Sequence, residues 1–259
     1  MNGAMSLLKT LTNNGVDVCF TNPGTSEMHM VAAIGQTGGM RSILSLFEGV
    51  CTGAADGYGR IAGKPACTLL HLGPGLSNGS ANLHNARKAN SPVINLIGDH
   101  ATYHKKYDAP LNSDVIGLAK PVSHWVRSVA DAVSLPGDAA DAVVAANVKP
   151  GQIATLIVPA DCAWDESVEP IAEREMPSAP RVNELSITKA SEMLGNGKPT
   201  VILMSNLALT EQSLRFADQV AQYSNARVFC DTFTSRLPRG EGRCSVERLA
   251  YFAEQATVQ

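Results

Sequence analysis

Residues 66–97 read ACTLLHLGPGLSNGSANLHNARKANSPVINLI and contain two short apolar runs separated by a longer, mixed segment. The runs Ala66–Leu70 and Pro92–Ile97 have the length and aliphatic content that are typical of buried β-strands. The segment between them predicts a helix over Leu76–Asn90. A strand, a helix and a second strand at this interval predict a βαβ unit, in which the two strands run parallel.

The same alternation extends on both sides of this unit. Apolar runs predict further strands at 18–21, 42–46 and 153–158, and amphipathic or alanine-rich segments predict helices at 4–13, 26–34, 48–61 and 130–146, with Ser26 as the cap of the second of these helices. We therefore expect an α/β fold over residues 1–165. Its architecture should be a doubly wound parallel sheet with helices on both faces.

The composition changes after this first domain. Residues 166–182 are acidic and dotted with prolines, which favours a linker between domains. Residues 183–259 then repeat the α/β pattern, with strands expected at 200–204 and 227–230 and three helices around them. Two strands are too few for a complete sheet, so this second α/β domain is expected to be incomplete.

Bulk composition excludes several classes of protein. The chain has 44% hydrophobic residues, 17% charged residues and a net charge of −3, and its lysines and arginines are scattered, so we expect neither a nucleic-acid partner nor a membrane partner. Its six cysteines lie far apart, without the spacing of a metal site. With no sign of a secretory signal, they indicate a reducing, cytoplasmic location.

Polar motifs follow three of the predicted strands. Asn22–Glu27 reads NPGTSE, Glu48 follows the second strand, and His71–Gly79 reads HLGPGLSNG. Each has an ordinary explanation: a turn, a carboxylate favoured at a helix start, and a histidine at a sheet edge followed by a loop that lets backbone approach closely. The ends of parallel strands meet at one edge, however, so together the motifs predict one site, over which the irregular stretch 98–120 would form a loop.

The ordered set of motifs resembles a known family. NPGTSE, then LFEG with AADGYGR, then HLGPGLSNG and SPVINLIGD are similar, in this order, to the pyrimidine-binding domain of the acetolactate synthase, benzoylformate decarboxylase and pyruvate oxidase family. The resemblance covers residues 1 to about 165, and the segment from Lys198 is similar to the start of the family's central domain. Residues 183–259 would then be a partial central domain.

The resemblance implies a cofactor and a role for each site residue. The cofactor is thiamine diphosphate, and Glu48 matches the glutamate that hydrogen-bonds its aminopyrimidine ring. Pro23, Gly24 and Asn78 lie where the family lets main chain and an amide approach that ring. Thr25 and His71 would lie near the substrate, a 2-oxo acid, with Thr25 holding its carboxylate and His71 relaying protons.

The family pattern is incomplete in this chain. The glycine–aspartate–glycine motif, with its later asparagines, that holds diphosphate and Mg²⁺ in the family has no match, and 98–100 (GDH) is a poor substitute. No metal ligands are therefore predicted here, and Mg²⁺ is expected in a further C-terminal domain. Phe47 replaces a polar residue found in several relatives. FAD binding stays undecided, and the complete enzyme is expected to be a homodimer or homotetramer.

Two classes of function remain open from the sequence. The favoured hypothesis is the N-terminal portion of a thiamine-diphosphate-dependent 2-oxo acid decarboxylase or of an acetolactate synthase-like carboligase. The alternative is a noncatalytic subunit, or one chain of a split enzyme, that binds a partner carrying the diphosphate domain. The residues do not identify the 2-oxo acid, and they do not decide between decarboxylation and carboligation.

Overall fold

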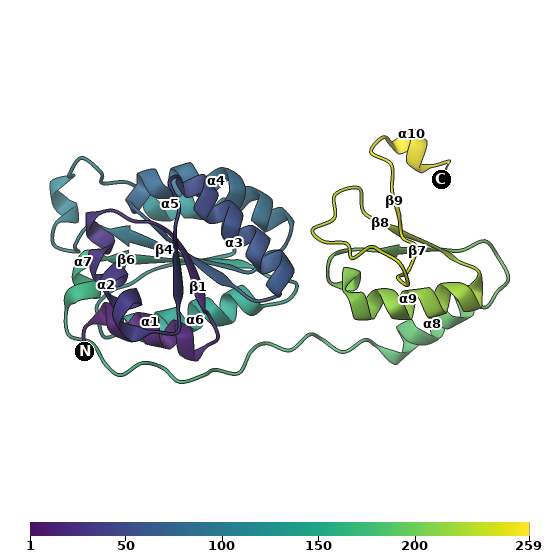
Figure 1. Ribbon diagram of the computed structural model, residues 1–259, viewed down its shortest axis with the longest axis horizontal. Coiled ribbons are helices and arrows are strands. Elements are labelled where there is room, and N and C mark those ends of the chain that lie inside the picture. The colour runs from purple at the N-terminus through teal and green to yellow at the C-terminus, as the bar shows by residue number, and fades with distance from the viewer. Residues whose placement is uncertain (259) are drawn as a thin grey trace. The chain divides into compact units, whose positions relative to one another are not determined.

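The computed structural model describes residues 1–258, which form two compact units, Met1–Ser178 and the residues from Ala179 onward (Figure 1). The first unit contains a six-stranded parallel sheet with the order β2-β1-β3-β4-β6-β5. The strands are β1 (Val18–Asn22), β2 (Arg41–Leu44), β3 (Ala66–Leu70), β4 (Val93–Asp99), β5 (Trp125–Ser128) and β6 (Ile153–Pro159). The prediction of a doubly wound α/β fold is confirmed.

Helices cover both faces of this sheet (Figure 1). One apolar core lies beneath α1 (Gly3–Asn13), α2 (Met28–Thr37), α6 (Leu135–Asn147) and α7 (Ala160–Trp164). The other lies beneath α3 (Glu48–Ala62), α4 (Leu72–Lys88) and α5 (Val115–Ala119). Strands β3, β4 and β6 are buried along their whole length, which is why their sequences are almost continuously apolar.

A row of polar side chains crosses the buried centre of the sheet. Thr68 Oγ1 donates to Asn95 Oδ1 at 2.8 Å, and Asn95 Nδ2 donates to Thr155 Oγ1 at 2.9 Å. Ser123 Oγ lies 2.7 Å from the same threonine oxygen. Because a shifted register would leave these buried groups unpaired, the row fixes the pairing of β3, β4 and β6.

The structure corrects several sequence-based boundaries. Helix α4 begins at Leu72, so the expected Gly-Pro-Gly loop is its first turn, and β2 ends at Leu44 instead of 46. Ser26 does not cap α2: the 3₁₀ turn η1 (Thr25–Glu27) precedes that helix, and the Glu27 side chain accepts a hydrogen bond from the Gly24 amide. Strand β5, helix α5 and the short turn η2 (Lys105–Tyr107) were not predicted.

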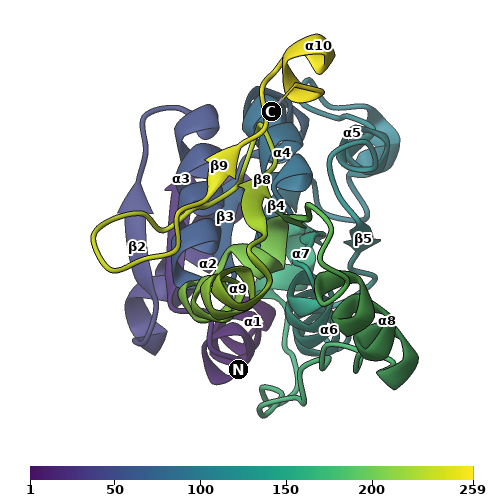
Figure 2. The same ribbon diagram turned by 90° about the vertical axis from the view of Figure 1, so that its right-hand side faces the viewer.

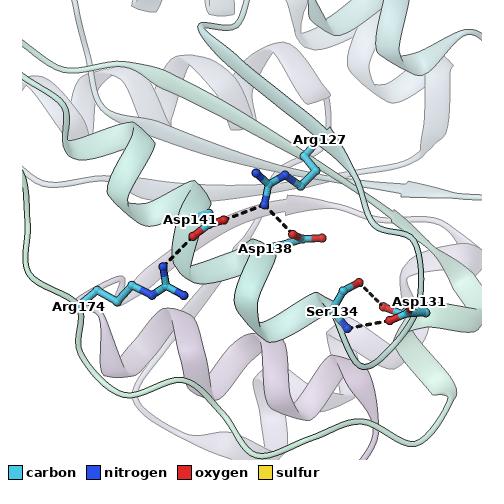
Figure 3. A network of polar contacts seen from close by, with 6 residues as sticks. All are labelled: Arg127, Asp131, Ser134, Asp138, Asp141 and Arg174. Atoms are coloured by element: carbon cyan, nitrogen blue, oxygen red, sulfur yellow. Dashed lines mark hydrogen bonds and ion pairs between the residues drawn. The ribbon is translucent and has the colours of Figure 1, made fainter.

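The segment after α7 lies along the first unit. Ser6 Oγ donates to the Val168 carbonyl at 2.8 Å, and the Ile171 amide donates to Thr10 Oγ1 at 3.0 Å. Farther along, the Arg174 guanidinium reaches Asp141 of α6 at 2.8 Å, and this aspartate also binds Arg127 of β5 (Figure 3). The first part of the predicted linker 166–182 is therefore an irregular segment that is hydrogen-bonded to α1 and α6.

The second unit has a small parallel sheet of its own, with the order β7-β8-β9, and Figure 2 shows β8 and β9 side by side. Its elements are β7 (Val201–Met204), β8 (Arg227–Cys230), β9 (Glu247–Arg248), α8 (Glu184–Leu194), η3 (Asn206–Leu209), α9 (Glu211–Ser224) and α10 (Ala253–Ala256). Leu209 and Leu214 pack against Val228 and Cys230 in its core. Over residues 1–258, no helix combines the length and apolar character needed to span a membrane.

Candidate active site

The ends of three neighbouring strands coincide at one edge of the main sheet. Asn22 at the end of β1 pairs with Leu70 at the end of β3, and Leu70 pairs with Ile97 of β4. On the other side of β1, Asn22 Nδ2 donates to the Ser45 carbonyl at 2.8 Å, just beyond β2. The segments that start at Pro23, Ser45, His71 and His100 therefore leave the sheet at a common edge, as the sequence predicts, with β4 paired to β6 for two residues beyond Ile97.

Glu48 and Asn78 are in direct contact. Glu48 is the first residue of α3 and is half-buried, and Asn78 projects from the second turn of α4. Asn78 Nδ2 donates to Glu48 Oε2 at 3.0 Å, and no described residue hydrogen-bonds the other carboxylate oxygen. The pair therefore presents a positioned carboxylate with one free oxygen, at the start of a helix whose dipole favours negative charge.

Close packing of α3 on α4 brings this pair together. Thr52 Oγ1 donates to the Gly79 carbonyl at 2.9 Å, and Asn82 Nδ2 donates to the Gly49 carbonyl at 2.7 Å. A Cβ at Gly79 would lie 2.8 Å from the Thr52 methyl carbon. The glycine-rich composition of both helices is thus needed for their short separation, and that separation brings the Asn78 amide to Glu48.

His71 and Gly24 form a second contact, at the ends of β3 and β1. The ring of His71 lies against the α-carbon of Gly24, because a Cβ there would be 2.4 Å from Nδ1. The next residue, Leu72, has φ 50°, an uncommon value for a branched side chain that is fully buried. This strained turn starts α4 directly after β3 and holds His71 at the sheet edge.

The partner of His71 is Glu27, which the sequence analysis did not single out. Glu27 Oε2 lies 2.8 Å from His71 Nδ1 and accepts the Gly24 amide proton at 2.6 Å. The bond to the Gly24 amide is half of a capping box, and because Gly24 has no side chain the sequence lacks the Ser/Thr-x-x-Glu signature that could have identified Glu27.

The Glu27 side chain is fully buried, and its second oxygen, Oε1, has no hydrogen-bond partner among the described residues. That oxygen sits against the bare α-carbon of Gly98, where a Cβ would be only 1.6 Å away. Burial raises the pKa of the Glu27 carboxyl above its usual value of 4.5, and the Gly24 amide and His71 oppose this rise because both stabilise the carboxylate.

The remaining predicted site residues lie at the same edge without such contacts. Pro23 is half-buried, and Thr25, the first residue of η1, is exposed and hydrogen-bonds no described residue through its side chain. Four apolar side chains within four residues of Glu48 in the sequence are exposed: Leu44 (69%), Leu46 (94%), Phe47 (50%) and Val50 (55%). The segments on either side of Glu48 therefore expose apolar side chains of the kind against which a flat ring packs.

Comparisons with known proteins show what the chain as a whole is similar to. Residues 1–125 match the family model of the thiamine pyrophosphate (TPP) enzyme N-terminal TPP binding domain. A Mycobacterium tuberculosis protein whose name is acetolactate synthase large subunit IlvX is 51% identical over the whole of this chain, which spans 50% of that protein. Benzoylformate decarboxylase of Pseudomonas aeruginosa is 29% identical over 199 residues, which are 75% of this chain and 37% of that protein.

The fold is shared with solved structures. A thiamine diphosphate-dependent 4-hydroxybenzoylformate decarboxylase from Rhodococcus jostii RHA1 superposes with a TM-score of 0.88 at 22% identity, over 100% of this chain and 50% of that one. The chain thus spans half or less of the length of these relatives. Its residues 1–125 match the N-terminal TPP-binding domain of the thiamine pyrophosphate enzyme family, and the whole chain is similar to a relative of that family.

Proposed function

We propose that this chain binds the aminopyrimidine end of thiamine diphosphate within an enzyme that acts on 2-oxo acids. The observation that carries the proposal is the contact between Glu48 and Asn78 at the sheet edge. One oxygen of Glu48 is held by the amide and the other is free, and the segments on either side of Glu48 expose apolar side chains. A ring that is flat, apolar on its faces and basic at a nitrogen fits both features.

The residues present fit the pyrimidine half of the cofactor. Glu48 would share a proton with a ring nitrogen, and Asn78 would keep the carboxylate aimed at it, while Pro23 and Gly24 would border the ring through their main chain. When bound, thiamine diphosphate supplies a nucleophilic carbon and an electron sink for decarboxylation. The protein's part is to position the ring, exclude water and move protons.

His71 and Thr25 would act on the substrate. His71 precedes α4 and lies about two turns before Asn78, with Nδ1 held by Glu27, so its other ring nitrogen can exchange a proton with a reacting 2-oxo acid. The exposed hydroxyl of Thr25 would bind the substrate carboxylate. A histidine here favours decarboxylation of the benzoylformate type, and an acetolactate synthase-like carboligation is the second outcome for the same site.

The other parts of the cofactor would require further chain. Among residues 1–258 there is no cluster of three or more His, Cys, Asp or Glu side chains that could hold a metal ion. We propose that Mg²⁺ and the diphosphate bind a C-terminal domain of the complete protein, that the complete enzyme is a homodimer or homotetramer, and that it is cytoplasmic. The 183–259 segment would be a partial central domain, and FAD binding there is left undecided.

The test uses the complete gene product that contains this sequence. Its release of CO₂ from pyruvate and from benzoylformate is measured with thiamine diphosphate and Mg²⁺, for the wild type, for Glu48→Gln and for the control Glu173→Gln, which changes an exposed glutamate away from the site. We expect turnover to fall by about 10²-fold or more in Glu48→Gln only, as for loss of a general acid–base group. Full turnover in that variant would refute the role of Glu48. A wild type without turnover would favour the noncatalytic or split subunit.

A further inference from the structure

We propose that Glu27 is a positioning residue: its buried carboxylate holds His71 as the tautomer with hydrogen on Nδ1, so that Nε2 is the nitrogen that exchanges protons at the site. This inference rests on the proposed function for the role of His71 near a substrate. The arrangement of the two side chains themselves is independent of any cofactor. Glu27 is assigned no contact with substrate, and it acts only through His71.

The hydrogen bonds define which atom carries the proton. Glu27 Oε2 accepts the Gly24 amide proton at 2.6 Å, and an amide can only donate. This bond stabilises the carboxylate form, which has acceptors and no donor. With Glu27 ionised, Oε2 can only accept, so the contact of 2.8 Å between Oε2 and His71 Nδ1 places the hydrogen on Nδ1. In the neutral ring, Nε2 is left with a lone pair.

Two bare α-carbons hold the pair in this arrangement. Gly24 supports the imidazole ring, since a Cβ there would come within 2.6 Å of three ring atoms. Gly98 provides the space for the carboxylate, since a Cβ there would come within 2.8 Å of three Glu27 atoms. Neither group can rotate away without leaving the close packing at the ends of β1, β3 and β4. The ring orientation is thus set by packing as well as by the hydrogen bond.

No other charged group is placed to define the tautomer. His29, on α2, stacks on Trp164 with ring centroids 5.6 Å apart. Asp99, next to Gly98 on β4, forms an ion pair with Lys105 at 2.6 Å. Within the part of the chain that the structure describes, the polar contact of the His71 ring is with Glu27. Replacing Glu27 should therefore release the ring, and replacing other acidic residues should not.

Proton transfer at Nε2 changes the charge of the His71 ring and leaves Glu27 unchanged. When the Nε2 lone pair takes a proton from a substrate group, an N–H bond forms and the bond to the donor breaks. The imidazolium that results has its positive charge next to the Glu27 carboxylate. In the reverse direction, the Nε2–H bond breaks, its electron pair returns to the nitrogen, and the ring is again neutral with hydrogen on Nδ1. Glu27 keeps its own protonation state throughout.

The experiment measures the tautomer directly, on the 259-residue chain without cofactor. The chain is labelled with ¹⁵N-histidine, and the NMR chemical shifts of the two ring nitrogens of His71 are measured at a pH at which the ring is neutral. The His71 signals are assigned by their loss in the His71→Gln variant. In the wild type we expect Nδ1 to have the shift of a protonated nitrogen and Nε2 that of an unprotonated one. Glu27→Leu, which removes the acceptor at similar size, should move the population toward the opposite tautomer. Glu48→Leu, the same change at the other glutamate, should leave it unchanged.

Two results would overturn the proposal: a wild-type His71 with hydrogen on Nε2, or a Glu27→Leu variant with unchanged ring shifts. The wild-type measurement needs no substitution, so it decides the matter even if Glu27→Leu fails to fold. Because no cofactor or turnover enters the measurement, its failure is distinguishable from failure of the proposed enzyme function. A ring with the expected tautomer in a protein without turnover would support the Glu27 assignment alone.

Discussion

The space between Gly98 and Glu27 gives a quantitative prediction for stability. In Gly98→Ala, the new Cβ would lie 1.6 Å from Glu27 Oε1, 2.5 Å from Cδ and 2.8 Å from Cγ. These distances are far below contact, so the buried carboxylate must leave its place. Displacement would break the bonds from Oε2 to the Gly24 amide and to His71.

The expected cost follows from these losses. Overpacking a well-packed site costs about 1–3 kcal/mol, and a hydrogen bond to a charged group contributes about 1.5–3 kcal/mol. We expect Gly98→Ala to lower the free energy of unfolding by about 3–5 kcal/mol, since part of the strain relaxes. In a Glu27→Ala background the three clashing atoms are absent, so the same change should cost about 1 kcal/mol or less.

The assay is urea unfolding of the 259-residue chain, followed by tryptophan fluorescence. Both tryptophans, Trp125 and Trp164, belong to the first compact unit, so the signal reports on the unit that contains Gly98. Gly57→Ala is the matched control, because Gly57 lies inside α3 with nothing within 4 Å of the position of a Cβ. Alanine there should raise the free energy of unfolding by about 0.5–1 kcal/mol. If Gly98→Ala costs the same with and without Glu27, the carboxylate does not occupy this space and the reasoning is refuted.

Two further predictions concern titration and thiol reactivity. Because burial raises the folded-state pKa of Glu27 above 4.5, the stability that this group contributes is present below that pH and is lost as pH rises through the raised value. The free energy of unfolding of the wild type, relative to Glu27→Leu, should therefore decrease as pH rises above 4.5, and an increase in that direction would contradict the direction of the pKa shift. All six cysteines are free and five are buried, so a thiol reagent should label the half-exposed Cys244 first in the native chain; burial raises the pKa of Cys162 to about 12, which slows it further. Cys244→Ser should remove the fast phase, and a fast phase that persists in this variant would show that a buried thiol is accessible.

The parts of the fold that could be predicted are those whose apolar runs are long. The 66–97 segment is such a case, because β3 and β4 are buried on both faces and their side chains are almost all aliphatic. Strand β5 was missed because its four residues, WVRS, are all half-buried at the edge of the sheet and include only two apolar residues. Its place depends on pairing with β6, which is a tertiary interaction and leaves little local signal.

The candidate site divides in the same way. Glu48, Asn78 and His71 follow predicted strands or lie on predicted helices, so the order of elements was enough to suggest that they share an edge. Glu27 also follows a strand, but it was interpreted only as part of the turn Asn22–Glu27. Its burial arises from Gly98, which is 71 positions away along the chain and lacks the side chain that would exclude it. A close approach of this kind cannot be derived from local pattern.

The two glutamates of the site differ in what they can reach, and this difference determines their roles. Glu48 is half-buried and keeps one carboxylate oxygen free of described partners, so a ligand from outside can hydrogen-bond it. Glu27 has no exposed surface, and its free oxygen faces the α-carbon of Gly98, so no external ligand can approach it. Its carboxylate can influence chemistry at the site only through the ring of His71. A substitution at Glu48 should therefore alter ligand binding itself, and a substitution at Glu27 should alter the proton that His71 carries.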